Sequence, residues 1–328
     1  MSESTKTDDI QENKRTQILI IGIAGGLAQI LSRIILQDHP DWEIIGVDAR
    51  DLSHVEPLKG LTILKMRYSR GNFEKIFREN QFDYVYHLAR MSHSQVGSEN
   101  LSKRLELSVM GTNRILDLSL RFGVKKAIIL STFHVYGALA DNSIFLTEEA
   151  PLKADMVYSQ LRDVVEMDQI CVNWMYKYQS KMDTVVLRPC NIIGSKIQNT
   201  MTKYLNSSLA LKPIDYNPIF QFIHEFDMAK VLYRTIDELP TGVYNVATNE
   251  FISLKDAINI VSKKGIPFPM FIAGKVNNLL KYANLDVPDY LISYLKYSCL
   301  ISNDQLKKYL GENFYRFSIQ ESIKLSSI

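Results

Sequence analysis

Short apolar runs alternate with longer amphipathic stretches along most of the chain. The short runs have the length of strands, while the longer stretches repeat apolar positions every three or four residues, as helices do. We expect strands at Gln17–Ile23, Glu43–Val47, Leu61–Met66, Tyr84–Ala89, Lys126–Ser131 and Thr184–Leu187, and helices at Leu27–Gln37, Phe73–Glu79, Leu101–Phe122 and roughly Asp155–Gln179. This alternation predicts an α/β fold with a doubly wound parallel sheet.

The pattern changes after Gly194, where shorter mixed segments begin. Residues 222–250 return to a strand, a helix (Glu225–Asp237) and a strand (Gly242–Ala247). We therefore expect a disordered tail over residues 1–15 and a dinucleotide-binding domain over residues 16–196, with residues 222–250 returning to it. A smaller C-terminal substrate lobe would come from residues 197–221 and 251–328, with the site in the cleft between them.

The first apolar run breaks into glycines at Gly22-Ile-Ala-Gly-Gly-Leu-Ala28, and a helical pattern follows at once. A strand, a glycine turn and a helix N-terminus in this order can bind the pyrophosphate of a dinucleotide. Gly22 would allow the tight turn, Gly25 would let the backbone approach the phosphates, and Ala28 would let the helix pack closely. The spacing is looser than G-x-G-x-x-G, so a plain turn is the alternative. The predicted cofactor-binding residues here are Gly22, Gly25, Gly26, Leu27 and Ala28.

The second predicted strand ends in a carboxylate, Asp48. At this place an acid can accept hydrogen bonds from the ribose hydroxyls of NAD and would repel the 2′-phosphate of NADP. Arg50 follows two residues later and could support NADP instead. The alternative is that Asp48 merely starts a turn. NAD is the favoured cofactor, and NADP stays open.

Composition narrows the class of protein. The chain has 328 residues, of which 46% are hydrophobic and 23% charged, which is ordinary for a globular protein. Its net charge of +2 lacks the basic excess of a dedicated nucleic-acid binder. Three scattered cysteines predict neither a disulfide framework nor a metal site. No secretory signal or membrane-spanning run is visible, so we expect a cytoplasmic protein with a small-molecule substrate.

Four further segments carry candidate chemistry: Tyr86-His-Leu-Ala-Arg90, Ile129-Leu-Ser-Thr-Phe-His-Val-Tyr-Gly137, Tyr158-Ser-Gln-Leu-Arg162 and Leu187-Arg-Pro-Cys-Asn-Ile-Ile-Gly194. In this order, and together with the glycine turn, they resemble the extended short-chain dehydrogenase/reductases of the NAD-dependent epimerase/dehydratase family. The resemblance runs from residue 17 to about residue 263. It implies a Rossmann sheet, bound NAD, and hydride exchange between the nicotinamide and a carbinol or ketone carbon.

Such hydride transfer needs a group that takes the hydroxyl proton as the carbonyl forms. Tyr158 can do so at neutral pH only if a nearby cation stabilises its phenolate. Arg162 lies four residues later, so on a continuous helix it would share a face with Tyr158 and lie beside the nicotinamide ribose. The family typically has lysine there, and a planar guanidinium preserves the charge but not the shape. An active oxidoreductase or epimerase and an NAD(P)-binding regulatory or scaffold protein with impaired catalysis therefore both stay open.

The resemblance also assigns neighbouring positions. Thr132 matches the serine or threonine that hydrogen-bonds the substrate oxygen, although it could bond only local backbone. Phe133 and His134 replace the Asp-Glu pair of the dehydratases, which argues against water elimination. His134 is either a second acid or base or a histidine packed at a strand end. The residues predicted to lie near the cofactor at the fourth strand are Leu88, Ala89 and Arg90.

The substrate is less defined. Asn191 matches an asparagine that contacts the substrate diphosphate in nucleotide-sugar members, but the arginine such members place before His224 is missing. Weaker point charges could replace it, namely Lys275, Lys281 or Lys296. The apolar segment Phe268–Leu295 would either line a pocket for a less charged carbonyl substrate or form the core of the small lobe. In this family the third and fourth long helices often pair across a homodimer, which is a further expectation.

Overall fold

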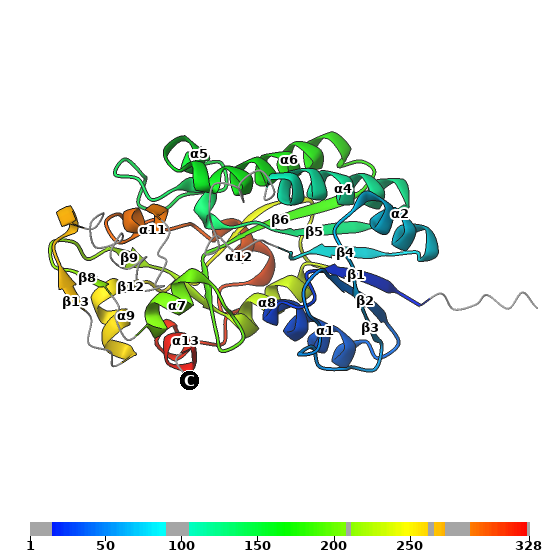
Figure 1. The fold of residues 1–328 in the computed structure, drawn as a ribbon, viewed down its shortest axis with the longest axis horizontal. Coiled ribbons are helices and arrows are strands. Elements are labelled where there is room, and N and C mark those ends of the chain that lie inside the picture. The colour runs from blue at the N-terminus through cyan, green and yellow to red at the C-terminus, as the bar shows by residue number, and fades with distance from the viewer. Residues whose placement is uncertain (1–14, 90–104, 208–210, 262–265, 273–288, 327–328) are drawn as a thin grey trace, which may run out of the picture.

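A parallel sheet forms the centre of the molecule in the computed structural model, which describes residues 15–89, 105–207, 211–261, 266–272 and 289–326 (Figure 1). Within this part of the chain the main sheet has seven strands in the order β11-β6-β5-β4-β1-β2-β3. The strands are β1 (Gln17–Ile21), β2 (Glu43–Asp48), β3 (Leu61–Lys65), β4 (Tyr84–His87), β5 (Lys126–Leu130), β6 (Asp183–Pro189) and β11 (Gly242–Val246). The predicted doubly wound α/β fold is confirmed.

Helices cover both faces of this sheet, as Figure 1 shows. One face carries α1 (Gly26–Asp38) and α8 (Glu225–Arg234), and the other carries α2 (Arg70–Glu79), α4 (Gly111–Arg121) and α6 (Arg162–Tyr178). The central strand β1 is apolar on both sides because both of its faces are covered, and Ile18–Ile21 are fully buried. The edge strand β3 is mostly exposed.

The strand order reverses between β1 and β4, since the chain fills one half of the sheet before it crosses to the other. At such a reversal the loops after neighbouring strands separate and leave a crevice at the carboxyl ends of the strands. The loops after β1 and β5 meet there.

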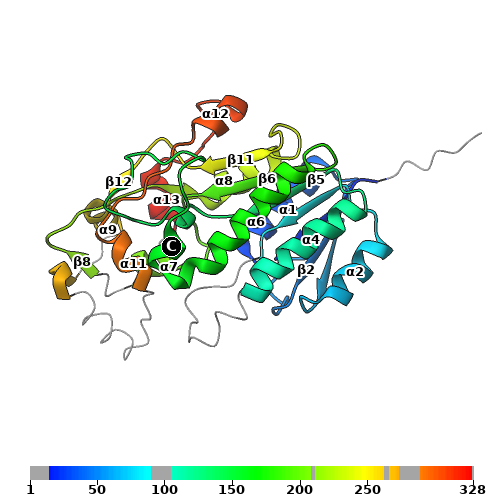
Figure 2. The same cartoon turned by 90° about the horizontal axis from the view of Figure 1, so that it is seen from above.

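The smaller lobe lies at one end of the sheet in both views (Figures 1 and 2). β10 (Phe222–His224) pairs with β7 (Asn191–Ile193), β12 (Ile252–Ser253) with β9 (Ile219–Phe220), and β13 (Ile266–Phe268) with β8 (Leu211–Pro213). Its helices are α7 (Thr200–Asn206), α9 (Leu254–Ile260), α11 (Asp289–Tyr294), α12 (Asp304–Leu310), α13 (Ile319–Ser326) and the 3₁₀ turn η4 (Met270–Ile272). The strand Phe222–His224 therefore pairs beside the main sheet and does not extend it.

Two of the predicted long helices are interrupted. Residues 101–104 lie outside the described residues, and a π-helical turn, η1 (Glu106–Met110), precedes α4. The segment predicted as one helix over Asp155–Gln179 is divided into α5 (Ala154–Val157), a 3₁₀ turn η3 (Ser159–Leu161) and α6. The break is at Tyr158, whose backbone is extended (φ −127°, ψ 99°). Periodicity did not reveal this break because apolar positions continue through it.

Among the described residues, no helix is long and apolar enough to span a membrane.

Candidate active site

A cleft of about 380 Å³ lies where the loops after β1, β2, β5 and β6 meet. Its wall includes the glycine turn, the end of β5, the start of β7 and the first residues of α7, and α11 closes one side. Segments far apart in the sequence therefore meet at the carboxyl edge of the sheet, which is where doubly wound folds bind ligands.

The first glycine of the turn is required by a close contact with the two residues that follow β4. Gly22 has a φ of +102°, a left-handed conformation that L side chains rarely adopt. A Cβ atom there would lie 2.8 Å from the backbone nitrogen of Ala89 and 3.0 Å from the carbonyl carbon of Leu88. The backbone of Leu88 and Ala89 thus packs against Gly22, and this contact does not depend on a cofactor.

The next two glycines differ in what faces them. Gly25 lines the cleft, and the nearest atom to a Cβ there would be the carbonyl oxygen of Gly22 at 3.3 Å. A Cβ at Gly26 would lie 2.4 Å from the carbonyl oxygen of Lys196, in the loop after β7. Gly26 therefore has no room for a side chain because the backbone of Lys196 lies against it. Gly25, in contrast, leaves its backbone accessible to a ligand. Leu27 also lines the cleft, and Ala28 is buried against the sheet.

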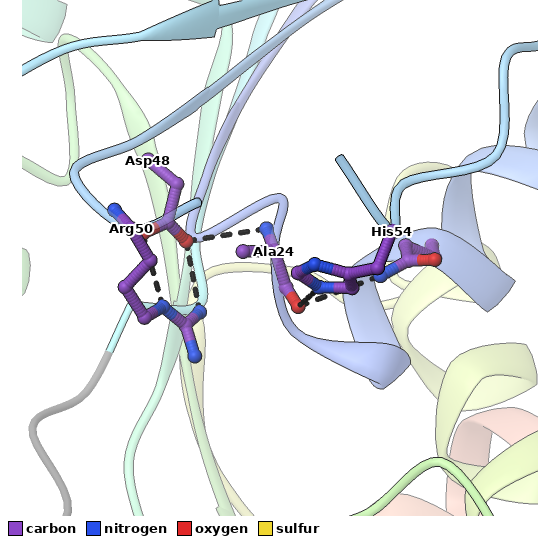
Figure 3. Close-up of polar contacts among 5 residues, drawn as sticks. Ala24, Asp48, Arg50 and His54 are labelled. Carbon is purple, nitrogen blue, oxygen red and sulfur yellow. Dashed lines mark hydrogen bonds and ion pairs between the residues drawn. The ribbon is translucent and has the colours of Figure 1, made fainter. Parts of the chain in front are cut away.

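Asp48 joins the end of β2 to the glycine turn (Figure 3). Its Oδ2 accepts the backbone N–H of Ala24 at 3.2 Å, and both of its oxygens accept from the Arg50 side chain, Oδ1 from Nε at 3.0 Å and Oδ2 from Nη2 at 2.8 Å. Burial raises the pKa of the Asp48 carboxyl, but the hydrogen bonds from Arg50 and Ala24 outweigh it, so the pKa lies below its usual value. The carboxylate stays charged and is paired with Arg50.

The carbonyl group of Ala24 also has a side-chain partner. The Nε2 atom of His54 lies 3.0 Å from the carbonyl oxygen of Ala24, as Figure 3 shows. The segment after β2 thus contacts the turn through both backbone groups of one residue. Sequence reasoning missed His54 because nothing in its spacing marks it.

The residues of this end of the cleft fit a dinucleotide. The N-terminus of α1 has no side-chain hydrogen bond at its cap and no acidic residue in its first turn, so its N–H groups and positive dipole end can take an anion. Gly25 leaves the space that a Cβ would fill, and the acid at the end of β2 lies beside the turn. Arg90 lies outside the described residues.

Thr132 and His134 lie together at the opposite end of the cleft. Thr132 is the N-cap of the 3₁₀ turn η2 (Phe133–Tyr136), and its Oγ1 lies 2.9 Å from Nδ1 of His134. Both side chains line the cleft, as does Asn191, whose amide nitrogen donates to the carbonyl oxygen of Gln221 at 3.2 Å. The structure therefore brings together three predicted site residues: Thr132, His134 and Asn191.

A buried ion pair lies behind the end of β5. Arg188 and Asp168 have side chains that are 4% and 0% exposed, and they form a bidentate pair with distances of 3.0 and 2.6 Å. Asp168 also accepts from the hydroxyl of Ser131, which precedes Thr132. Arg188 donates to the Tyr136 hydroxyl at 2.9 Å, so the pair contacts residues on both sides of the Thr132–His134 segment. In the sequence, the signal that could have revealed this ion pair is Asp168, an acidic residue among the apolar positions of α6.

Tyr158 and Arg162 are not brought together by the structure. Tyr158 precedes η3 and Arg162 begins α6, so the shared helix face that the spacing predicted does not exist. The Tyr158 hydroxyl hydrogen-bonds Ser293 on α11, and the Arg162 Nε donates to Glu166 at 2.5 Å with the arginine side chain 59% exposed. Neither residue is among those that line the cleft in the described structure.

The basic residues proposed for a substrate diphosphate are also placed. Lys275 and Lys281 lie outside the described residues. The Nζ atom of Lys296 lies over the rings of Tyr216 and Tyr297, 5.4 and 5.0 Å from their centroids. Within the described part of the cleft wall the basic side chains are Lys196 and Arg50.

The sequence profile of the NAD dependent epimerase/dehydratase family matches residues 18–247. The chain belongs to this family. The matched span begins in β1 and ends just after β11, so it contains the glycine turn, Asp48, Thr132 and Asn191. The family consists of NAD-dependent enzymes, and the chain is accordingly an enzyme that uses NAD.

Individual relatives are distant. A protein of Mycobacterium tuberculosis described as uncharacterised is 22% identical over 308 residues, which span 90% of this chain and 79% of that protein. UDP-glucose 4-epimerase 2 of Arabidopsis thaliana is 24% identical over 295 residues, 77% of this chain and 83% of the relative.

Solved structures share the fold over almost the whole chain. The UDP-glucose 4-epimerase of Thermotoga maritima, solved with UDP-glucose, superposes with a TM-score of 0.74 at 16% identity and covers 95% of this chain and 97% of that one. The dTDP-glucose 4,6-dehydratase of Bacillus anthracis in complex with NAD gives 0.72 at 17% identity, with 95% of each chain covered.

Proposed function

We propose that this family member exchanges a hydride between NAD and a carbinol or ketone carbon of a nucleotide-sugar-like substrate. The observation that carries the proposal is that the glycine turn, Thr132 and Asn191 line one cleft. The relatives that act on UDP-glucose and dTDP-glucose support the substrate class. The proposed homodimer through α4 and α6 stays a prediction.

Each end of the cleft has a distinct task in this proposal. The backbone at Gly25 and the N-terminus of α1 would hold the pyrophosphate, and Asp48 and Arg50 would face the adenosine ribose. Bound NAD supplies the hydride acceptor. Thr132 would hydrogen-bond the oxygen of the reacting carbon, while Asn191 and Lys196 would face the substrate phosphates.

The predicted roles of Tyr158 and Arg162 need a rearrangement. Tyr158 could take the substrate proton only if its hydroxyl left Ser293 and turned toward the cleft. Arg162 could stabilise a Tyr158 phenolate only by leaving Glu166. Thr132, by contrast, already lines the cleft and needs no such movement.

Titration with NADH, followed by nicotinamide fluorescence, tests the cofactor half of the proposal. Gly25→Val places a side chain where the backbone is open, and we expect it to weaken NADH binding at least tenfold. Gly71→Ala is the matched control, because a Cβ at Gly71 meets nothing within 4 Å and Gly71 lies in α2, away from the cleft. Equal affinity in all three proteins would contradict the proposed cofactor site.

Incubation with NAD and UDP-glucose or dTDP-glucose, followed by mass spectrometry and chromatography of the sugar nucleotides, tests the substrate half. We expect conversion of at least one of them to an epimer or keto product. A protein that binds NADH but converts neither would contradict the nucleotide-sugar assignment.

The second candidate is an NAD-binding regulatory or scaffold protein with impaired catalysis. The observation that favours it is the outward ion pair of Arg162 with Glu166, at the position where the family places a catalytic lysine. Tight NADH binding without any turnover across a metabolite extract would support this second function.

A further inference from the structure

We propose that Ser293 is a positioning residue, which holds Tyr158 outside the cleft until a substrate binds against α11. The inference rests on the proposed function, in which Tyr158 takes the substrate proton. It begins from one long-range contact: the Tyr158 hydroxyl hydrogen-bonds the Ser293 hydroxyl, 135 residues away in the sequence. With this bond in place, Tyr158 is not among the described residues that line the cleft.

The helix that carries Ser293 is also part of the cleft wall. Tyr290 and Leu291 of α11 line the cleft, and Ser293 lies three residues after Tyr290, on the same turn of the helix. The ring of Tyr290 lies 5.7 Å from that of His134, so α11 faces the end of the cleft where Thr132 lies. A substrate whose reacting carbon reaches Thr132 must therefore enter beside α11, and a shift of Tyr290 also shifts Ser293.

The backbone around Tyr158 is fixed, but its hydroxyl depends on Ser293. The Tyr158 N–H donates to the carbonyl oxygen of Ala154 at 2.8 Å, and the Tyr158 carbonyl accepts the N–H of Leu161 at 2.9 Å. These bonds hold the chain at the break between α5 and η3 and leave the side-chain torsions unrestrained. The hydrogen bond with Ser293 is then the polar contact that directs the hydroxyl away from the cleft.

A second observation shows that this position of α11 carries a cost. Tyr294 directly follows Ser293 and is 2% exposed, yet its hydroxyl has no hydrogen-bond partner among the described residues. Burial raises the pKa of Tyr294 well above its ordinary value, so the hydroxyl is neutral and keeps a proton to donate. A buried hydroxyl without a partner opposes the arrangement that buries it. A shift of α11 that gives this hydroxyl a partner would relieve the cost.

The strength of the contact suits a residue that must release its partner. One neutral hydrogen bond changes an equilibrium by about threefold to tenfold, so it can favour the held position and still yield when a substrate binds. The apparent affinity for the substrate is reduced by the fraction of molecules in the held position. Removal of the Ser293 hydroxyl should therefore strengthen substrate binding by a similar factor.

The first test needs no substrate. N-acetylimidazole acetylates accessible tyrosine hydroxyls, and peptide mass spectrometry gives the rate at each tyrosine. We expect Ser293→Ala to raise the rate at Tyr158 about threefold to tenfold, and Ser293→Thr to keep the wild-type rate because threonine retains a hydroxyl. Ser302→Ala is the matched control, since that hydroxyl bonds the exposed Asp304. An unchanged rate at Tyr158 in Ser293→Ala would overturn the inference.

Two other tyrosines make this measurement specific. Tyr176 on α6 is 65% exposed and provides the reference rate. Tyr290 is 3% exposed and should stay unreactive in Ser293→Ala. Acetylation of Tyr290 in that variant would mean that α11 has unfolded. Ser293 would then be a structural residue of the helix, and the positioning role would be wrong.

The second test measures kinetics with UDP-glucose and NAD. We expect Ser293→Ala to lower KM for UDP-glucose about threefold to tenfold, with kcat and NADH affinity within about twofold of wild type. A lower kcat with an unchanged KM would show that Ser293 supports the reacting state, which contradicts the inference. If wild type converts no UDP-glucose, the nucleotide-sugar proposal fails for this probe, and the acetylation rates decide the question for Ser293.

Discussion

Two arginine–carboxylate pairs lie near the candidate site, and they differ in burial. Arg188 and Asp168 are almost inaccessible and tie α6 to β6 and, through Ser131, to the end of β5, whereas Arg162 and Glu166 lie on the exposed side of the same helix. The first pair supports Thr132 and His134, and the second supports neither. An arginine at a familiar motif position therefore need not reach the site, while one outside the motif can support it.

The largest expected effect comes from breaking the buried pair. Asp168→Ala leaves the Arg188 guanidinium buried without its partner, and we expect a loss of about 3–5 kcal/mol in the free energy of unfolding. Urea denaturation at pH 7 measures it. Glu166→Gln, two residues away on α6, is the matched control and should leave the urea midpoint nearly unchanged. Equal losses in the two variants would erase the difference between the pairs.

A buried histidine, uncharged at neutral pH, offers a second measure of the effect of burial on an ionisable group. His224 is 3% exposed, and burial lowers its pKa to about 4. Because the folded pKa lies below the unfolded value of about 6.5, its stabilising contribution is complete above pH 6.5 and is lost as the pH falls toward 4. We expect a loss of up to about 3 kcal/mol over this range.

Comparing wild type with His224→Asn isolates the contribution of His224 to the pH dependence of the free energy of unfolding. Asparagine can still cap the N-terminus of α8, where the His224 side chain accepts the backbone N–H of Phe226. Urea denaturation at pH 7 and pH 4.5 should show a shallower pH dependence in the variant. Parallel curves would mean that His224 does not titrate as its burial predicts.

Arg50 and Asp48 form a pair of intermediate exposure, with side chains 61% and 5% exposed. The two charges balance, but the largely exposed guanidinium of Arg50 still presents hydrogen-bond donors at the adenosine end of the cleft. We expect Arg50→Leu to weaken NADPH binding about tenfold, because a 2′-phosphate loses its cationic partner, and to change NADH binding much less. Fluorescence titration with both dinucleotides measures this, and an equal change for the two would contradict it.

The smallest expected effect is at the exposed pair. Arg162→Lys restores the residue type that the family places here, yet its side chain would begin from the same outward position at the start of α6. We expect NADH affinity and kcat to stay within about threefold of wild type. A gain in kcat of tenfold or more would show that a lysine reaches the cleft where the arginine does not, and it would support Tyr158 as the proton acceptor.

Much of the cofactor end was predictable because it depends on local sequence. The glycine turn needs small residues between a strand and a helix, and Asp48 directly follows an apolar run, so a few consecutive residues define each feature. Thr132 and Asn191 were found by their motifs. The place of the Tyr158 side chain was not, because its hydroxyl contacts Ser293, which is 135 residues away in the sequence.

The strand and helix order, the family and the dinucleotide turn could be predicted from the chain alone, since short-range spacing and apolar periodicity encode all three. Which polar residues meet follows from the folded arrangement of distant segments. Whether Arg162 pairs with Glu166 or faces the cleft, and whether Asp168 is buried against Arg188, depends on contacts between segments that no local pattern specifies. Burial then sets the strength of each charge interaction, and burial is a property of the assembled fold.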